Sequence, residues 1–230
     1  MEQFKKFEEA IGVTFKDKEL LKKAFTHRSY LNENSGEGIE HNERLEFLGD
    51  AVLELVVTSH LYKTYPNNPE GDLTAYRSSL VNTISISDAA TSLQMNDYLL
   101  LSKGEAKDTG KARQYILANT YEAVIGAIYL DQGYEAAKDF IAASLFGKLE
   151  EIIEKKLYKD AKSWVQEEAQ EHEDVTPTYE VLHESGPDHD KNFEVGVYFG
   201  EELIAKGKGK AKQEAEQNAA RAALEIKNWV

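Results

Sequence analysis

The spacing of apolar positions along the chain changes near residue 159. From residue 4 to about residue 158, apolar side chains recur every three to four residues, and segments rich in Gly, Asn and Pro interrupt them. This pattern predicts an all-α domain over residues 1–158, with helices at 4–11, 18–24, 40–65, 70–80, 85–95, 111–130 and 134–155.

The remainder of the chain has a mixed pattern. It predicts a short amphipathic helix at 161–171, followed by three strands of alternating apolar and polar side chains at 178–184, 193–199 and 202–206. An alanine-rich helix follows at 210–227. The sequence therefore predicts a small α+β domain of order α-β-β-β-α over residues 161–228, joined to the first domain by a short linker.

The composition of the chain excludes several classes of function. The 230 residues include 41 acidic and 27 basic side chains, giving a net charge of −14, which counts against a protein that holds polyanions by bulk charge. The absence of cysteine excludes disulfides, thiol catalysis and Cys-ligated metals. Because the chain lacks an apolar membrane span or signal core, we expect a soluble protein that stays in the cytoplasm and binds no membrane.

Three acids share one face of the helix that begins with HNERLEFLGD (41–50). At about 100° per residue, Glu43, Glu46 and Asp50 fall within roughly 60°, and the apolar side chains lie on the opposite side: Leu45, Leu48, Val52 and Leu55. A solvated helix face explains this pattern, but the acids have no Lys partner four residues later. Acids stacked this closely repel one another unless a cation or a basic ligand lies between them.

A single carboxylate interrupts the apolar segment YILANTYEAVIGAIYL (115–130). A helix that is apolar nearly all round is buried, and burying the unpaired Glu122 would cost several kcal/mol. Either Arg77 or Arg113 pairs with it, or a divalent cation does, with Asn119 one turn earlier on the same face. Hard cations such as Mg²⁺ take oxygen ligands, which two facing helices would supply from Glu46, Asp50, Asn119 and Glu122.

Other polar residues have plain structural explanations on the sequence alone. Glu70 opens a predicted helix, where an acid complements the helix dipole. The histidines form no metal-binding spacing, and we expect structural roles for His27, His41 and His60.

Lysines alternate with small residues just before the last helix, at positions 206, 208, 210 and 212. The alternation is consistent with a solubilising turn. It is also consistent with a phosphate clamp made of lysines and a helix N-terminus.

Taken together, these motifs resemble the ribonuclease III family. HNERLEFLGD resembles its signature, PEGDL (69–73) and RSSLV (77–81) resemble the next block, and residues 115–130 resemble its second catalytic helix. Residues 161–228 resemble the double-stranded RNA-binding domain of bacterial members, including PTYE (177–180), ESGPDH (184–189) and AEQNAA (215–220). The resemblance covers essentially the whole chain.

The resemblance implies roles for particular residues. It implies an Mg²⁺-dependent homodimer that cuts both strands of duplex RNA, leaves 5′-phosphates and short 3′ overhangs, and processes rRNA and other precursors. By this resemblance Glu46, Asn119 and Glu122 are metal ligands, Asp50 and Glu122 are catalytic, and Glu43 and Glu70 line the substrate valley. RNA contacts are implied for Gln166, Glu167, His189, Lys210 and Lys212.

Two positions depart from the family pattern. Asn119 stands where the best-known members carry Asp, which keeps an oxygen ligand but removes a negative charge. Gln213 replaces the second basic residue of the final-helix motif. These departures leave open an alternative, a catalytically impaired dimer that binds duplex RNA.

Overall fold

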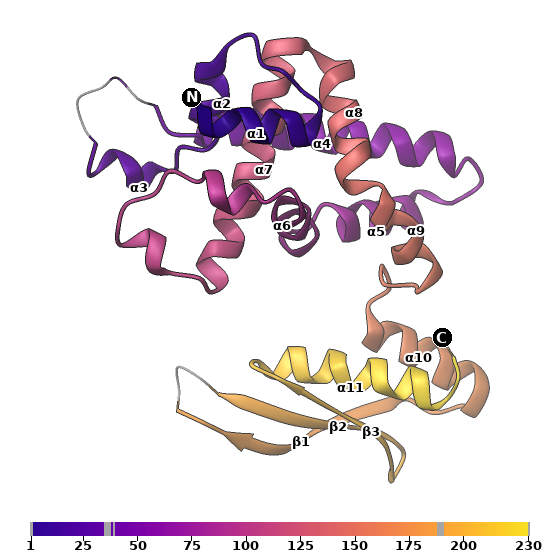
Figure 1. The fold of residues 1–230 in the computed structure, drawn as a ribbon. Coiled ribbons are helices and arrows are strands. Elements are labelled where there is room, and N and C mark those ends of the chain that lie inside the picture. Colours follow the sequence, from indigo (N-terminus) through magenta and orange to yellow (C-terminus); the bar gives the residue numbers. More distant parts are fainter. Residues whose placement is uncertain (1, 35–37, 39, 188–190, 230) are drawn as a thin grey trace. The chain divides into compact units, whose positions relative to one another are not determined.

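The computed structural model describes residues 2–34, 38, 40–187 and 191–229. The chain divides into two compact units, Met1–Ile153 and Glu154–Val230 (Figure 1). Each unit has its own core.

The first unit is built from helices. They are α1 (Glu2–Ile11), α2 (Lys18–Ala24), α3 (Arg28–Leu31), α4 (Glu43–Thr64), α5 (Glu70–Leu80), α6 (Thr83–Ser92), α7 (Lys111–Gln132), α8 (Tyr134–Leu145) and α9 (Gly147–Glu154), with short 3₁₀ helices η1 (Met95–Tyr98) and η2 (Glu105–Lys107). The predicted all-α class is confirmed. None of the helices in the described ranges combines the length and the apolar composition needed to cross a membrane.

The helix predictions differ from the structure in three places. The predicted helix 134–155 is two helices, α8 and α9, which separate at Phe146. The helix predicted at 85–95 begins earlier, because the Asn82 side chain accepts the Ser85 N–H, and it ends earlier, before the left-handed Gln94. The one-turn helix α3 was not predicted.

Helices α4 and α7 cross at the centre of the first unit (Figure 1). At the crossing, a Cβ added to Gly49 would lie 1.7 Å from the Glu122 carbonyl oxygen, and one added to Gly126 would lie 2.2 Å from the Leu45 carbonyl oxygen. Only glycine allows backbones to approach so closely. The two glycines therefore set the distance between the helices that carry the predicted acids.

Most of α7 is buried, as its sequence predicts, including Ile116–Ala118 and Ala123–Ile128. On α4, Leu45 and Val52 are buried. Leu55, on the same side of the helix, is 55% exposed. The apolar pattern of α4 is wider than the strip that the rest of the unit covers.

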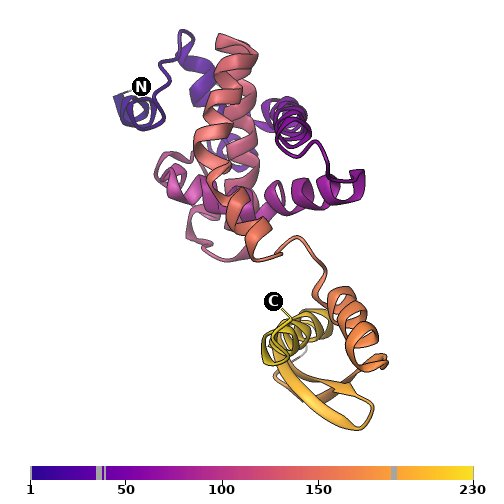
Figure 2. The ribbon, with the colours of Figure 1, turned by 90° about the vertical axis from the view of Figure 1, so that its right-hand side faces the viewer.

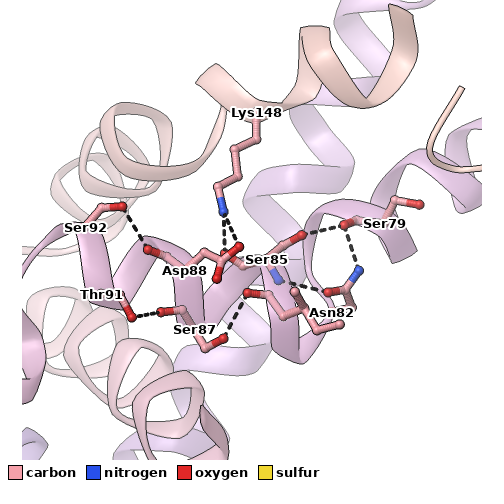
Figure 3. A network of polar contacts seen from close by, with 9 residues as sticks. Ser79, Asn82, Ser85, Ser87, Asp88, Thr91, Ser92 and Lys148 are labelled. Carbon is pink, nitrogen blue, oxygen red and sulfur yellow. Dashed lines mark hydrogen bonds and ion pairs between the residues drawn. The ribbon is translucent and has the colours of Figure 1, made fainter. Parts of the chain in front are cut away.

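Most polar side chains of α6 make hydrogen bonds or ion pairs (Figure 3). Lys148 of α9 donates to the Ser85 carbonyl at 3.2 Å and pairs with Asp88 at 3.3 Å. The hydroxyl groups of Ser87, Thr91 and Ser92 donate to backbone carbonyls of the same helix. This network joins α9 to α6.

The second unit is a three-stranded antiparallel sheet with two helices on one face (Figure 2). Its elements are α10 (Ala161–Glu173), β1 (Pro177–Ser185), β2 (Asn192–Phe199), β3 (Glu202–Gly209) and α11 (Lys212–Ile226), with sheet order β1-β2-β3. The core joins Trp164 of α10, Phe199 of β2 and the alanine face of α11. The predicted α-β-β-β-α order is confirmed.

Strand β3 is longer than predicted, and its alternation explains the lysine–glycine pattern. A Cβ on Gly207 would lie 2.1 Å from the Ala219 nitrogen, so glycine is required where α11 packs on the strand. Neighbouring side chains of a strand point to opposite faces. Lys206 and Lys208 accordingly face away from α11, and both pair with Glu194 of β2, at 3.5 and 3.4 Å.

Candidate active site

The α4–α7 crossing brings together acids that are far apart in the sequence. Glu46 and Asp50 lie on α4, and Asn119 and Glu122 lie on α7. The Asn119 side chain hydrogen-bonds to Glu46, and both Glu46 and Asp50 act electrostatically on Glu122. Four oxygen-bearing side chains from two helices therefore occupy one region.

Burial and mutual repulsion favour the protonated forms of Glu46 and Glu122 when no cation is bound. Burial raises the pKa of Glu122, the nearby Asp50, Glu46 and Glu54 add to the rise, and together they bring it to about 8. Burial raises the pKa of Glu46 as well, with Glu43 and Asp50 adding to the rise and the Asn119 hydrogen bond opposing it. A bound cation would remove this unfavourable arrangement.

The proposed structural partners of Glu122 are engaged elsewhere. Arg77 pairs with Glu54 at 3.1 Å and donates to Thr58 at 3.0 Å. Arg113 donates to the Asn96 side chain at 2.7 Å. Within the described part of the chain no base lies within ion-pair distance of Glu122, so the ion-pair alternative is wrong.

The donor set fits a hard divalent cation. Among the described residues no three acidic or histidine side chains already stand in position to hold one ion. Carboxylate and amide oxygens are nevertheless the ligands that Mg²⁺ prefers, and Mg²⁺ is usually held by one or two carboxylates together with water and phosphate. Glu46, Asn119 and Glu122 supply that chemistry, with Asp50 beside them.

The two further acids lie at different distances from this region. Glu43 lines the same cleft as Glu46 and Asn119. Glu70 is exposed at the start of α5, accepts the Thr74 hydroxyl at 2.7 Å, and lines a separate cleft. The fold therefore groups Glu43 with the acids of the crossing and leaves Glu70 apart from them.

The histidines have structural contacts. His27 caps α3, where its Nδ1 accepts the Ser29 N–H at 3.3 Å. His60 stacks on Phe146 with ring centroids 4.0 Å apart. The Nδ1 atom of His41 accepts the Glu43 N–H at 3.4 Å.

The predicted RNA contacts that the structure describes lie on α10, at the start of α11 and just before it. Gln166 and Glu167 are exposed on α10, and Lys210 and Lys212 are exposed at the start of α11. The Lys212 ammonium is 3.9 Å from Glu216, a loose pair that a phosphate could replace. His189 lies outside the described residues.

Sequence reasoning missed one residue of the candidate active site, Glu54, and considered Arg77 only as a partner of Glu122. Glu54 acts on Glu122, and Arg77 neutralises Glu54 while joining α5 to α4. The position of Glu54, four residues after Asp50, would have placed it on the acidic face. Its pairing with Arg77 depends on how α5 folds back, which the helical pattern does not reveal.

Comparisons with known proteins agree with this arrangement. Residues 17–149 match the Ribonuclease-III-like family, and residues 161–227 match the double-stranded RNA binding motif. Ribonuclease 3 of Protochlamydia amoebophila is 47% identical over 217 residues, which are 94% of this chain and 89% of that protein. Ribonuclease 3 of Carboxydothermus hydrogenoformans is 48% identical over 95% of this chain and 93% of that protein.

A solved structure matches the first unit. The nuclease domain of ribonuclease III from Campylobacter jejuni is 41% identical, with a TM-score of 0.58, and the match covers 64% of this chain and 96% of that one. A helical nuclease unit followed by a double-stranded RNA binding motif defines a two-domain ribonuclease. The chain belongs to the ribonuclease III family and is an endoribonuclease, and membership implies a divalent metal cofactor.

Proposed function

We propose that this protein is an Mg²⁺-dependent endoribonuclease that hydrolyses double-stranded RNA. The products are expected to carry 5′-phosphates, 3′-hydroxyls and short 3′ overhangs, and the substrates to include precursors of rRNA and mRNA in the cytoplasm. The observation that carries the proposal is the meeting of Glu46 and Asp50 with Asn119 and Glu122 where α4 crosses α7. The double-stranded RNA binding motif in the same chain supports the substrate class.

The acids have distinct tasks in this scheme. Glu46, Asn119 and Glu122 would hold Mg²⁺, which supplies an acidified nucleophilic water and neutralises charge on phosphate oxygens. Asp50 stands beside the ligands as an exposed carboxylate that accepts and orients a water proton. Glu43 and Glu70 would line the path of the RNA. The buried setting of Glu122 strengthens its interaction with a cation, because the local dielectric is low.

Duplex RNA is recognised mainly by shape and by phosphate contacts, so a few well-placed cations suffice. Lys210 and Lys212 would contact phosphates at the start of α11, whereas Gln166, Glu167 and His189 would reach a minor groove. This explains how a chain with a net charge of −14 binds RNA. Bound cations at the acids would also reverse the local charge that the substrate meets.

A homodimer fits the exposed surface of α4. Phe47 is 82% exposed and Tyr62 is 74% exposed. The two side chains are about 60° apart around the helix axis, so they share one face. Phe47 itself lines a cleft with Leu48 and Leu130, whose other walls include the charged Lys23 and Arg44. A two-fold dimer uses the same patch on both copies, so each Phe47 would pack against the cleft of the other subunit.

The test is an incubation with a long RNA duplex of defined sequence. We expect fragmentation with Mg²⁺ and none with chelator, and we expect single-stranded RNA of the same sequence to stay intact. End labelling and sequencing of the products would report the 5′-phosphates and the overhang length. A duplex that is shifted in a gel but left intact with Mg²⁺ would refute the nuclease and support the binding-only alternative, for which Asn119 and Gln213 are the motivating residues.

A further inference from the structure

A cleft of about 690 Å³ opens beside the candidate metal ligands Glu46 and Asn119. Its lining includes three acids, Glu43, Glu46 and Glu105. Among the described residues that line the cleft, Arg28 carries the one fixed positive charge. A phosphodiester that approaches the acids through this cleft would therefore meet a single cation of the protein.

The Arg28 side chain makes one long ion pair and has unused guanidinium N–H donors. Its side chain is 72% exposed, and its Nη1 lies 3.6 Å from Oε1 of Glu43. The other carboxylate oxygen of Glu43 is 3.8 Å from Nδ1 of His41. Within the described part of the chain the Arg28 side chain makes this ion pair and no hydrogen bond. Its guanidinium N–H groups are available to a ligand in the cleft.

The backbone that carries Arg28 is fixed, in contrast to its side chain. The His27 N–H donates to the Leu100 carbonyl at 3.1 Å, and the His27 ring accepts the Ser29 N–H. The Ser29 hydroxyl in turn accepts the Ser102 N–H at 3.1 Å. Residues on both sides of Arg28 are thus attached to residues 100–102, so the base of its side chain is anchored at the rim of the cleft.

We propose that Arg28 binds a backbone phosphate of the RNA strand in this cleft, and that Glu43 is a positioning residue that acts on RNA through Arg28. The guanidinium matches two phosphate oxygens with parallel hydrogen bonds, which a lysine ammonium does not. Glu43 keeps the side chain at the rim until phosphate replaces it, since the 3.6 Å pair is loose. This assignment rests on the proposed function and adds a phosphate contact in the nuclease unit.

The first experiment measures duplex binding without cleavage. Full-length protein carrying Glu122→Gln is titrated with a labelled RNA duplex over a series of NaCl concentrations, with and without Arg28→Ala. We expect Arg28→Ala to weaken binding about tenfold on all duplex sequences, and to lower the salt slope by about one for each occupied cleft. Arg28→Lys should retain the salt slope but lose part of the affinity, because its charge remains and the paired donors are gone.

The matched control is Lys138→Ala, which removes a surface cation paired with Glu135 on α8 at 2.7 Å, away from the cleft. Its affinity and salt slope should equal those of the parent. An Arg28→Ala protein that melts like the parent and keeps both affinity and salt slope would overturn the proposal. So would an Arg28→Lys protein that loses the salt slope.

A double-mutant cycle tests the role of Glu43. If Glu43 positions Arg28, Glu43→Gln weakens binding severalfold when Arg28 is present and has no further effect beside Arg28→Ala. Equal effects of Glu43→Gln in both backgrounds would overturn the positioning role. Cleavage of duplex RNA by the unaltered protein is scored separately. Failure there refutes the proposed function, whereas a changed salt slope concerns Arg28 alone.

Discussion

Gly49 packs directly on the backbone of Glu122, so closely that an added Cβ would lie 1.7 Å from the Glu122 carbonyl oxygen. Gly49, which precedes the candidate catalytic residue Asp50 on α4, therefore fixes the position of Glu122 on α7. The distance between the two halves of the site is a backbone property, and side-chain adjustment cannot restore it. This contact makes Gly49 a sensitive point for both stability and activity.

Replacing Gly49 by Ala is expected to destabilise the protein by about 3 kcal/mol or more, because the methyl group must push two buried helices apart. Urea unfolding checks this. The control is Gly147→Ala, where a Cβ meets nothing within 4 Å, and which should be neutral within about 1 kcal/mol. Gly49→Ala protein with parental stability and cleavage would contradict the close packing.

The raised pKa of Glu122 predicts that the stability of the metal-free protein depends on pH. Between the ordinary value of 4.5 and about 8, the folded state keeps a proton that the unfolded state has lost. Stability should therefore decrease as pH rises through this window and level off above it. Unfolding in EDTA at pH 5, 6, 7 and 8 measures the trend.

Glu122→Gln should flatten this pH dependence, since the amide does not titrate. Glu135→Gln, which changes an exposed acid on α8, should leave it as in the parent. Mg²⁺ added at pH 8 should stabilise the parent more than Glu122→Gln protein, because binding to the folded state alone raises stability. Identical pH profiles for parent and Glu122→Gln would show that Glu122 is not the group responsible.

Asn119→Asp is expected to increase Mg²⁺ affinity. The change adds a negative charge beside Glu46 and removes the amide that now hydrogen-bonds to it. Both effects favour a bound cation over the metal-free state. The Mg²⁺ concentration that gives half-maximal cleavage should fall, and calorimetric titration of Mg²⁺ should show tighter binding. If neither quantity changes, Asn119 is not a ligand that matters.

Lys212→Ala should weaken duplex binding and make its salt dependence shallower by about one unit, because one phosphate contact is lost. Lys206→Ala is the matched control. Lys206 lies on the opposite face of the sheet from α11 and pairs with Glu194. Its removal should affect binding far less. Equal effects of the two substitutions would argue for general charge attraction and against a contact at the start of α11.

Phe47→Ala is expected to weaken the proposed homodimer, because it removes the most exposed large apolar side chain of α4. Sedimentation at micromolar concentration should show a shift toward monomer. Ile84→Ala changes a side chain that is also largely exposed, 62% on α6, and should leave the dimer intact. A parent protein that sediments as a monomer would refute the dimer itself.

The helices that build the candidate site were predictable because each has a strong local pattern. The apolar surround of Glu122 predicted a buried helix, and the arc of Glu43, Glu46 and Asp50 predicted an acidic face. Helix ends near Phe146 and Gln94 were not predictable from periodicity, since a few backbone hydrogen bonds decide them. The alternation of lysine and glycine belonged to a strand, and only the packing of α11 on Gly207 revealed it.

The order of elements, the residue types of the site and the family of the chain can all be read from the amino-acid sequence. Local spacing carries this information, because side-chain periodicity follows directly from helix and strand geometry. Only the three-dimensional structure shows which acids lie together. It also shows that Arg77 pairs with Glu54 and not with Glu122, and that Arg28 lies at the rim of the cleft. These relationships join residues that are far apart in the sequence, and the distance between the acids of α4 and α7 depends on how closely the two backbones pack at Gly49 and Gly126.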